Sequence, residues 1–334
     1  MAEKLVEGDY LETVEGLFFA VKGFLHPDGG VVAYLRYVPD PEGERLRRGK
    51  RYRRVYDIED TTEFLNAKYP HYIGNVSYLN QRLQVVRVEK IKHIYKPNAA
   101  LKSILEKPRT SLEKAASEFT LALIAESRVP MKHLGISGSL MTGFANEESD
   151  IDLVVYGERQ GRRVYEALSA LRNDNGGFRA YHGDEIRKVV MSRWGDTGLD
   201  PRKFFDIEAR KILHGLYFKT EYFVRLVREP RDIESSSKPI HTARCRGIVS
   251  EDKYSIFTPC RYRICELKFV DPKVDEEVSE LLSFRGKFTE QAVKDDLVEF
   301  RGTVEEYILN DEKRYRVVLG SSGNYLIPVE MLDR

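Results

Sequence analysis

The stretch GSLMTGFANEESDID, residues 138–152, places small residues and carboxylates in an order suited to binding phosphate and metal ions. Gly138-Ser139 opens the stretch, and Asp150 and Asp152 stand one residue apart at its end. A glycine allows the backbone to approach phosphate oxygens closely, and a serine after it can donate its N–H and hydroxyl to them. Mg²⁺ prefers hard oxygen ligands such as carboxylates. The spacing therefore indicates a site for a polyphosphate and divalent metal.

The apolar residues around the acid pair predict a strand that presents both carboxylates together. Carboxylates at positions i and i+2 of a strand point to the same side, so Asp150 and Asp152 could share metal ions. Ile151 and the apolar residues 153–155 would anchor that strand in the core. Transfer of a nucleotidyl group needs mainly positioning and charge neutralisation, which two bound divalent ions supply.

Similar fragments elsewhere in the chain lack one half of this arrangement. Acid-Ile-acid triplets also occur at 57–59, 206–208 and 232–234, but none has a Gly-Ser at the right distance upstream between apolar strands. Residues 320–323 are small but no carboxylate pair follows them. The combination occurs only at 138–152.

These residues resemble the signature of the minimal nucleotidyltransferases in the DNA polymerase beta superfamily. The matching positions are Gly138, Ser139, Gly143, Ser149, Asp150, Ile151, Asp152 and Leu153. The resemblance covers about residues 110–228 and implies a small mixed sheet flanked by helices. It also implies transfer of a nucleoside monophosphate from a nucleoside triphosphate such as ATP, with Mg²⁺ or Mn²⁺ as cofactor. By the same resemblance, Gly138 and Ser139 would hold the triphosphate, and Asp150 and Asp152 the metals.

A third carboxylate is expected on a strand next to the acid pair. Glu221, in an apolar run that predicts a strand, is the best placed, with Asp206, Glu208 and Asp184 as alternatives. For Asp206 and Glu208, the competing interpretation is a position on a helix surface.

The chain departs from the family pattern directly after Gly138-Ser139. Many members carry arginines there, whereas this chain has Leu-Met-Thr at 140–142, so the charge of the triphosphate must be met elsewhere. The cationic candidates are Arg187, Lys188, Lys203, Lys219 and Arg225. The histidines at 133, 182 and 214 are isolated in sequence and are interpreted as structural.

Periodicity and turn residues predict an α+β protein. Two apolar runs within residues 16–38 flank a His-Pro-Asp-Gly-Gly turn and predict a β-hairpin. A capping box opens a helix over 111–127, and the short strands 133–136 and 151–156 and a helix over 162–172 follow.

Three domains are expected from these shifts in pattern. They are a β-rich N-terminal domain (1–105), a central nucleotidyltransferase domain with a mixed sheet (106–238) and a β-barrel-like, OB-like C-terminal domain (239–334). A linker rich in serine, residues 231–239, marks the second boundary. The three cysteines, Cys245, Cys260 and Cys265, lack metal-site spacing and are expected to be small buried apolar residues in strands.

Charge and hydropathy narrow the class of partner. The formal net charge is +1, so a nucleic-acid surface would have to be local. Residues 45–54 form a basic run, interpreted either as a solvated hairpin tip or as a patch that contacts phosphates. The basic run and the barrel favour RNA over a small molecule as acceptor, and a non-catalytic RNA- or protein-binding protein of the same fold is the alternative. The absence of a membrane-spanning run and of a signal-peptide core predicts a cytoplasmic protein with no membrane partner.

Overall fold

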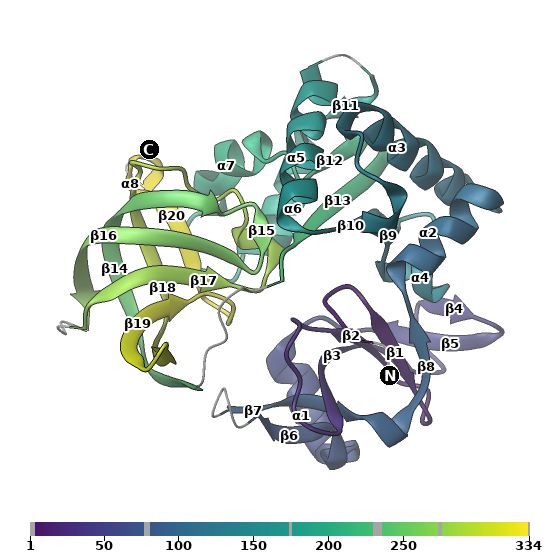
Figure 1. The fold of residues 1–334 in the computed structure, drawn as a ribbon, viewed down its shortest axis with the longest axis horizontal. Helices are drawn as coiled ribbons and strands as arrows, with labels where there is room; N and C mark the ends of the chain where they lie inside the picture. The colour runs from purple at the N-terminus through teal and green to yellow at the C-terminus, as the bar shows by residue number, and fades with distance from the viewer. Residues whose placement is uncertain (1–3, 77–80, 174–175, 230–235, 273–275, 333–334) are drawn as a thin grey trace. The chain divides into compact units, whose positions relative to one another are not determined.

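The computed structural model describes residues 4–76, 81–173, 176–229, 236–272 and 276–332. Figure 1 shows the mixed α+β fold expected from the sequence, with a sheet near the N-terminus, a central sheet and a sheet near the C-terminus. The chain forms two compact units, one of Met1–Ala167 with Lys219–Val224 and one of Leu168–Phe218 with Arg225–Arg334. The division into three domains near residues 105 and 238 stays a prediction.

The N-terminal sheet is antiparallel and curls into a half-barrel (Figure 1). Its strand order is β4-β5-β3-β2-β1-β8, and β7 pairs with β3 and with β6. The elements are β1 (Tyr10–Thr13), β2 (Phe18–Val21), β3 (Gly30–Pro39), β4 (Arg45–Arg47), β5 (Lys50–Arg54), α1 (Ile58–Lys68), β6 (Ile73–Val76), β7 (Gln81–Arg87) and β8 (Ile91–Tyr95).

The predicted hairpin within residues 16–38 is confirmed as the antiparallel pair β2–β3. Alternating residues of both strands, among them Phe19 and Leu35, are fully buried in a core shared with Leu65 of α1. β2 is buried at every position, because Phe18 on its other face packs in a second cluster with Tyr37, Tyr52 and Phe144.

The central segment contains the sheet in the order β11-β12-β13-β10-β9. Its strands are β9 (Leu134–Ile136), β10 (Ile151–Tyr156), β11 (Phe178–Arg179), β12 (His214–Tyr217) and β13 (Thr220–Val227). Its helices are α2 (Pro97–Glu106), α3 (Ser111–Ser127), α4 (Gly138–Thr142), α5 (Glu158–Asn173), α6 (Asp184–Trp194) and α7 (Phe205–Arg210).

Local sequence signals placed several of these elements. The helix predicted over 111–127 is α3, whose first turn is closed by a hydrogen bond of 3.1 Å from Glu113 N to Thr110 Oγ1. The strands expected at 133–136 and 151–156 are β9 and β10, which pair antiparallel. The helix expected over 162–172 lies within α5.

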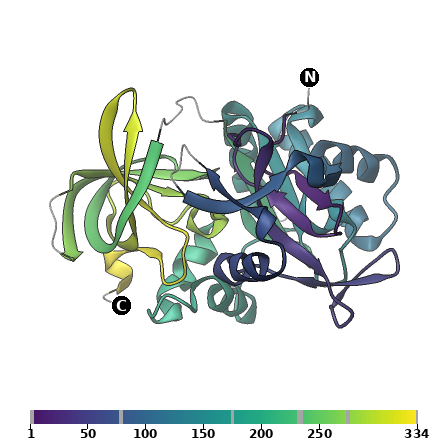
Figure 2. The ribbon, with the colours of Figure 1, turned by 90° about the horizontal axis from the view of Figure 1, so that it is seen from below.

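The C-terminal sheet closes into a barrel with the strand order β14-β16-β17-β19-β18, because β18 pairs back with β14. Within this barrel β17 and β19 pair in parallel, and the other neighbours pair antiparallel. This is the strand order of an OB-like fold, as predicted. Figure 2 shows the curvature of the green and yellow strands that form it. The elements are β14 (Ser236–Tyr254), β16 (Cys260–Asp271), β17 (Val278–Ser283), β18 (Leu297–Leu309), β19 (Glu312–Val318), β20 (Tyr325–Pro328) and α8 (Val329–Leu332). The short β15 (Phe257–Thr258) pairs in parallel with β13 of the central sheet.

Aromatic stacking joins the helices α6 and α7 to the barrel core. The fully buried Trp194 stacks on Phe204 with ring centroids 4.4 Å apart, and Phe288 meets its edge at 5.4 Å. Burial of Cys245 and Cys260 confirms the cysteine interpretation for those two residues and raises the pKa of each thiol to about 12. For Cys265 the interpretation is wrong, because this residue is exposed on β16.

Two further expectations concern the linker and membrane-spanning segments. Of the predicted linker, residues 231–235 lie outside the described residues, and the prediction is wrong for 236–239, which begin β14. Within the described part of the chain, no helix is both long and apolar enough to cross a membrane.

Candidate functional site

The backbone of Gly138 lies against the carboxylate of Asp152. Ser137 N donates a hydrogen bond of 2.9 Å to Asp152 O, which ties the start of α4 to β10. Gly138 has φ +62°, and a Cβ at this position would lie 1.9 Å from Asp152 Oδ2. Position 138 therefore needs glycine for its backbone conformation and for the space that Asp152 occupies. The structure brings together these two residues, which the motif had placed at one site.

Ser139 is buried at the second position of α4. Its side chain is 3% exposed, and its Oγ has no hydrogen-bond partner among the described residues. A buried hydroxyl without a partner carries a desolvation cost that a bound polar ligand would offset.

The acid pair lies at the start of the strand predicted for it. Asp150 directly precedes β10 and Asp152 is its second residue, and both are half-buried. A Cβ on Gly8 would meet the side chains of Val154 and Tyr156, so the N-terminal segment covers the face that these residues share with Asp152 by strand alternation. Ile151, Leu153 and Val155, on the other face, are fully buried and anchor the strand.

Glu221 lies on β13, which neighbours β10 in the central sheet. It is exposed, whereas the next residue, Tyr222, is buried and packs on Phe119 of α3 with ring centroids 5.0 Å apart. Strand alternation therefore directs Glu221 away from α3. Among the described residues, no three His, Cys, Asp or Glu side chains are grouped so that they could hold a metal ion.

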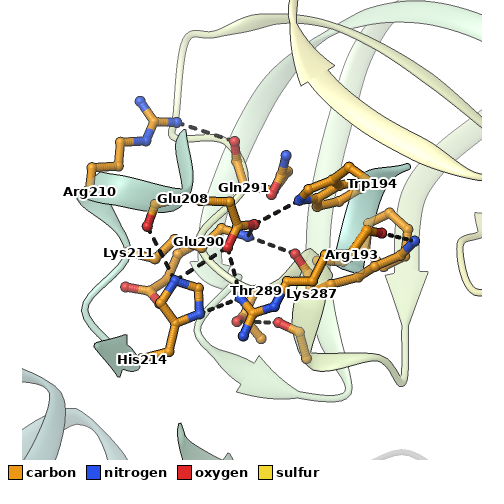
Figure 3. A network of polar contacts seen from close by, with 12 residues as sticks. Arg193, Trp194, Glu208, Arg210, Lys211, His214, Lys287, Thr289, Glu290 and Gln291 are labelled. Carbon is orange, nitrogen blue, oxygen red and sulfur yellow. Dashed lines mark hydrogen bonds and ion pairs between the residues drawn. The ribbon is translucent and has the colours of Figure 1, made fainter. Parts of the chain in front are cut away.

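Glu208, an alternative for the third carboxylate, is instead the centre of a buried ionic network (Figure 3). Its carboxylate accepts hydrogen bonds of 2.7 Å from Arg193 Nη1, 2.7 Å from Lys211 Nζ and 2.9 Å from Trp194 Nε1. Burial alone would raise the pKa of Glu208, but the charges of Lys211 and Arg193 lower it below its usual value. The interpretation of Glu208 as a residue of a helix surface is wrong, because its partners satisfy it inside the core.

His214 belongs to the same network and is not isolated. The ring contacts Arg193 through Nδ1 and Glu208 O through Nε2, and burial lowers its pKa well below the ordinary value. The remaining carboxylate alternatives, Asp184 on α6 and Asp206 on α7, are exposed.

The basic run at residues 45–54 divides into a buried and an exposed half. β4 and β5 form a hairpin around Arg48 and Gly49, which both have positive φ. Arg45 and Arg47 are 6% and 9% exposed, whereas Leu46 between them is 64% exposed. Neither a solvated tip nor a phosphate patch describes the whole run, because alternation turns two of its arginines inward.

The two buried arginines hold the segment between α4 and β10. Arg45 Nη1 donates hydrogen bonds of 3.3 Å to Phe144 O and 3.1 Å to Ser149 Oγ, next to Asp150. Arg47 Nε donates a hydrogen bond of 2.7 Å to Thr142 O. Sequence reasoning missed these residues as part of the site. The one local signal was the Arg-Leu-Arg alternation at 45–47. In an ordinary surface strand the apolar residue would face the core, whereas here Leu46 faces solvent and the two arginines are buried.

An aromatic cluster fixes the same segment. Phe144 follows Gly143, whose φ is +77°, and its ring stacks on Tyr37 with centroids 4.0 Å apart. Phe18 and Tyr52 each pack on Phe144 at 4.8 Å. Phe18 and Tyr37 are therefore core residues.

The cationic residues expected to meet the triphosphate charge are mostly at the surface. Arg187, Lys188 and Lys219 are exposed, and Lys203 and Arg225 are half-buried. Lys203 donates to Leu332 O.

Comparison with known proteins agrees with this geometry. Residues 120–235 match a family described as "Nucleotidyltransferase domain". The central segment of the chain is therefore a nucleotidyltransferase domain, and the resemblance to the DNA polymerase beta superfamily is confirmed for it. The chain is also similar to "Uncharacterized protein MJ1086" of Methanocaldococcus jannaschii, with 29% identity over 329 residues that cover 94% of this chain and 95% of that protein. The similarity thus extends through both flanking segments. No solved structure matches this chain.

Proposed function

We propose that this protein is a divalent-metal-dependent nucleotidyltransferase that moves a nucleoside monophosphate from a nucleoside triphosphate such as ATP to a hydroxyl acceptor. The observation that carries the proposal is the contact between the Gly138 backbone and the Asp152 carboxylate at the start of β10. It lies inside the segment that matches the nucleotidyltransferase family.

The donor set fits a hard divalent ion. Asp150 and Asp152 offer carboxylate oxygens from one side of an anchored strand, and both are half-buried, so an ion could reach them. The buried Ser139 Oγ without a partner lies directly after Gly138 and offers a donor to phosphate. We propose that Asp150 and Asp152 hold Mg²⁺ or Mn²⁺. When bound, the metal would neutralise phosphate charge and lower the pKa of the acceptor hydroxyl.

We propose the remaining roles from the motif and from the position of Glu221 on the strand beside β10. Gly138 and Ser139 bind the triphosphate, and Glu221 on the neighbouring strand supplies the third carboxylate. The acceptor oxygen bonds to the α-phosphorus while the bond from that phosphorus to the pyrophosphate oxygen breaks. Pyrophosphate leaves, and the hydroxyl proton passes to a carboxylate of this set.

We propose RNA as the source of the acceptor hydroxyl. Arg48, Lys50, Arg51 and Arg53 form the exposed half of the basic hairpin. The C-terminal barrel has the OB-like order, and OB folds commonly bind oligonucleotides.

Pyrophosphate release from each NTP, with Mg²⁺ or Mn²⁺ and with RNA, protein or metabolite acceptors, tests the function. Asp152→Asn should abolish release and also weaken Mn²⁺ binding measured by titration calorimetry. The matched control is Glu147→Gln, an exposed carboxylate in the same segment, which should leave both unchanged. Wild-type protein that binds NTP but releases no pyrophosphate would support the non-catalytic alternative instead.

A further inference from the structure

The segment after Gly138-Ser139 lacks the arginines that many relatives of this superfamily carry, and the N-terminal hairpin brings an arginine to it. Arg45 comes from β4, 104 residues before Ser149, the residue to which its Nη1 donates. The same nitrogen donates to Phe144 O, so the guanidinium is held at two points beside the acid pair. The N-terminal sheet thus places a fixed positive charge next to the predicted metal ligands.

Arg45 and Arg47 differ in how completely they are satisfied. The Arg47 guanidinium donates to Thr142 O and to the Tyr95 hydroxyl and lies 3.5 Å from Glu12 Oε2. It also lies over the rings of Phe18 and Phe144, at 4.8 and 5.5 Å from their centroids. These contacts account for a buried cation, so Arg47 has a structural role.

One N–H of the buried Arg45 guanidinium, at Nε, is not used in a hydrogen bond to the described residues. Its Nε has no hydrogen-bond partner among the described residues, and the side chain of Glu44, 4.0 Å from that nitrogen, is 55% exposed. A buried guanidinium N–H without an acceptor is costly, and a planar guanidinium suits phosphate oxygens. Ser139 Oγ, on α4, is likewise buried and has no hydrogen-bond partner in the described part of the chain.

The Tyr37 side chain lies within electrostatic range of both Arg45 and Asp152. Burial raises the pKa of the Tyr37 hydroxyl, Tyr10 adds to the rise, the charges of Arg54 and Arg45 oppose it, and the Asp152 charge adds a smaller part. Both charges therefore lie close enough to the Tyr37 side chain to act on it. A phosphate group bound near Asp152 would therefore also lie near the Arg45 guanidinium.

We propose that Arg45 binds the terminal phosphates of the nucleoside triphosphate, in place of the arginines missing after Gly138-Ser139. One guanidinium nitrogen holds the backbone and Ser149 in front of Asp150, and Nε is left to donate to a phosphate oxygen. This inference rests on the proposed function, since it requires a triphosphate in the site. It assigns the N-terminal sheet a direct part in substrate binding.

Binding of ATP, pyrophosphate and AMP, each measured by titration calorimetry with Mg²⁺, tests this assignment. Arg45→Gln should weaken ATP and pyrophosphate by about 10- to 100-fold, the loss of a hydrogen bond to a charged group, and leave AMP unchanged. Arg45→Lys keeps the charge but not the planar fork, so it should weaken ATP by a smaller factor while still sparing AMP. The matched control is Arg87→Gln, an exposed arginine at the end of β7 in the same sheet, which should change none of the three.

The selectivity between ATP and AMP decides the outcome. A merely structural Arg45 would lower the affinities for ATP and AMP by the same factor, and that result overturns the assignment, as does unchanged ATP binding. If Arg45→Gln does not fold, the ATP-to-AMP ratio of Arg45→Lys gives the same decision. If the wild-type protein binds no ATP in the presence of Mg²⁺ or Mn²⁺, the proposed function is overturned, and the role of Arg45 with it. If the wild type binds ATP and the Arg45 variants bind it equally well, only the role of Arg45 is overturned.

Discussion

Gly138 and Asp152 are packed so closely that the carboxylate takes the space of a side chain at position 138, with 1.9 Å between a Cβ there and Asp152 Oδ2. The positive φ of Gly138 adds a second requirement for glycine. The two residues therefore depend on each other for the shape of the site, and they lie 14 positions apart on different elements, α4 and β10.

Gly138→Ala should displace the Asp152 carboxylate and abolish Mn²⁺ binding measured by titration calorimetry. It should also lower the free energy of unfolding by about 1–2 kcal/mol or more, because alanine is strained at positive φ. Gly143→Ala is the matched control. It has φ +77°, but its Cβ would meet only Arg47 Nε at 3.7 Å, an ordinary contact. Equal Mn²⁺ affinity in both variants would show that the contact with Asp152 has no part in metal binding.

The parts of this fold that depend on local patterns could be predicted from the sequence. The hairpin β2–β3, the capped helix α3 and the strands β9 and β10 each carry a period or a cap within a few residues. The closure of the barrel also agreed with its spacing of short strands. The hairpin, the helix and each strand are decided by neighbours in the chain, whereas closure of the barrel pairs β14 with the distant β18.

Pairings between distant residues could not be predicted in the same way. Arg45 meets Ser149 across 104 positions, and nothing in a basic run indicates which of its members turn inward. Glu208 stands in an acid-Ile-acid triplet that looks solvated, yet Arg193 from α6 and Lys211 neutralise it inside the core. Burial of charge depends on partners that only the folded chain brings together.

Arg47→Met should destabilise the N-terminal sheet by about 3 kcal/mol, because it removes one member of a buried ionic group. Burial tends to raise the pKa of Glu12, but hydrogen bonds from Lys92 and Tyr95 and the charge of Arg47 hold it below its usual value. Loss of Arg47 therefore leaves Glu12 with less compensation and frees Thr142 O. Urea unfolding followed by circular dichroism measures the effect. Arg51→Met, at an exposed position of the same hairpin, should cost less than about 1 kcal/mol, and an equal cost for both variants would contradict the structural role of Arg47.

The ionic network around Glu208 should make the second unit sensitive to acid. His214 is held neutral because burial lowers its pKa below 6.5, so the unfolded chain binds a proton that the folded chain excludes. The free energy of unfolding should therefore fall by about 1.4 kcal/mol per pH unit as the pH drops below 6.5. Glu208, whose pKa is lowered, adds a further loss below pH 4.5, where the unfolded carboxylate takes up a proton first.

Trp194, the single tryptophan of the chain, donates to Glu208 and so reports on this network by fluorescence. Urea titrations at several pH values should show a shallower loss between about pH 6.5 and 5 for His214→Asn than for the wild type. His182→Gln, at an exposed histidine of the same unit, should keep the wild-type slope. An unchanged slope in His214→Asn would mean that another group takes up the proton.

The exposed half of the basic hairpin is the feature on which RNA as acceptor depends. Arg48 and Lys50 flank the turn at Gly49 and are exposed, whereas Arg45 and Arg47 are buried and cannot reach RNA from their present positions. If the tip holds a phosphodiester chain, the double variant Arg48→Gln/Lys50→Gln should weaken binding of single-stranded RNA. It should also reduce the slope of log affinity against log salt by about 0.7 for each phosphate that the variant no longer neutralises. Lys102→Gln/Lys114→Gln removes the same charge from exposed positions on α2 and α3 and serves as the control. If both double variants change the RNA affinity and the salt slope by the same amount, the effect reflects net charge alone. The acceptor hydroxyl would then belong to a small molecule or a protein.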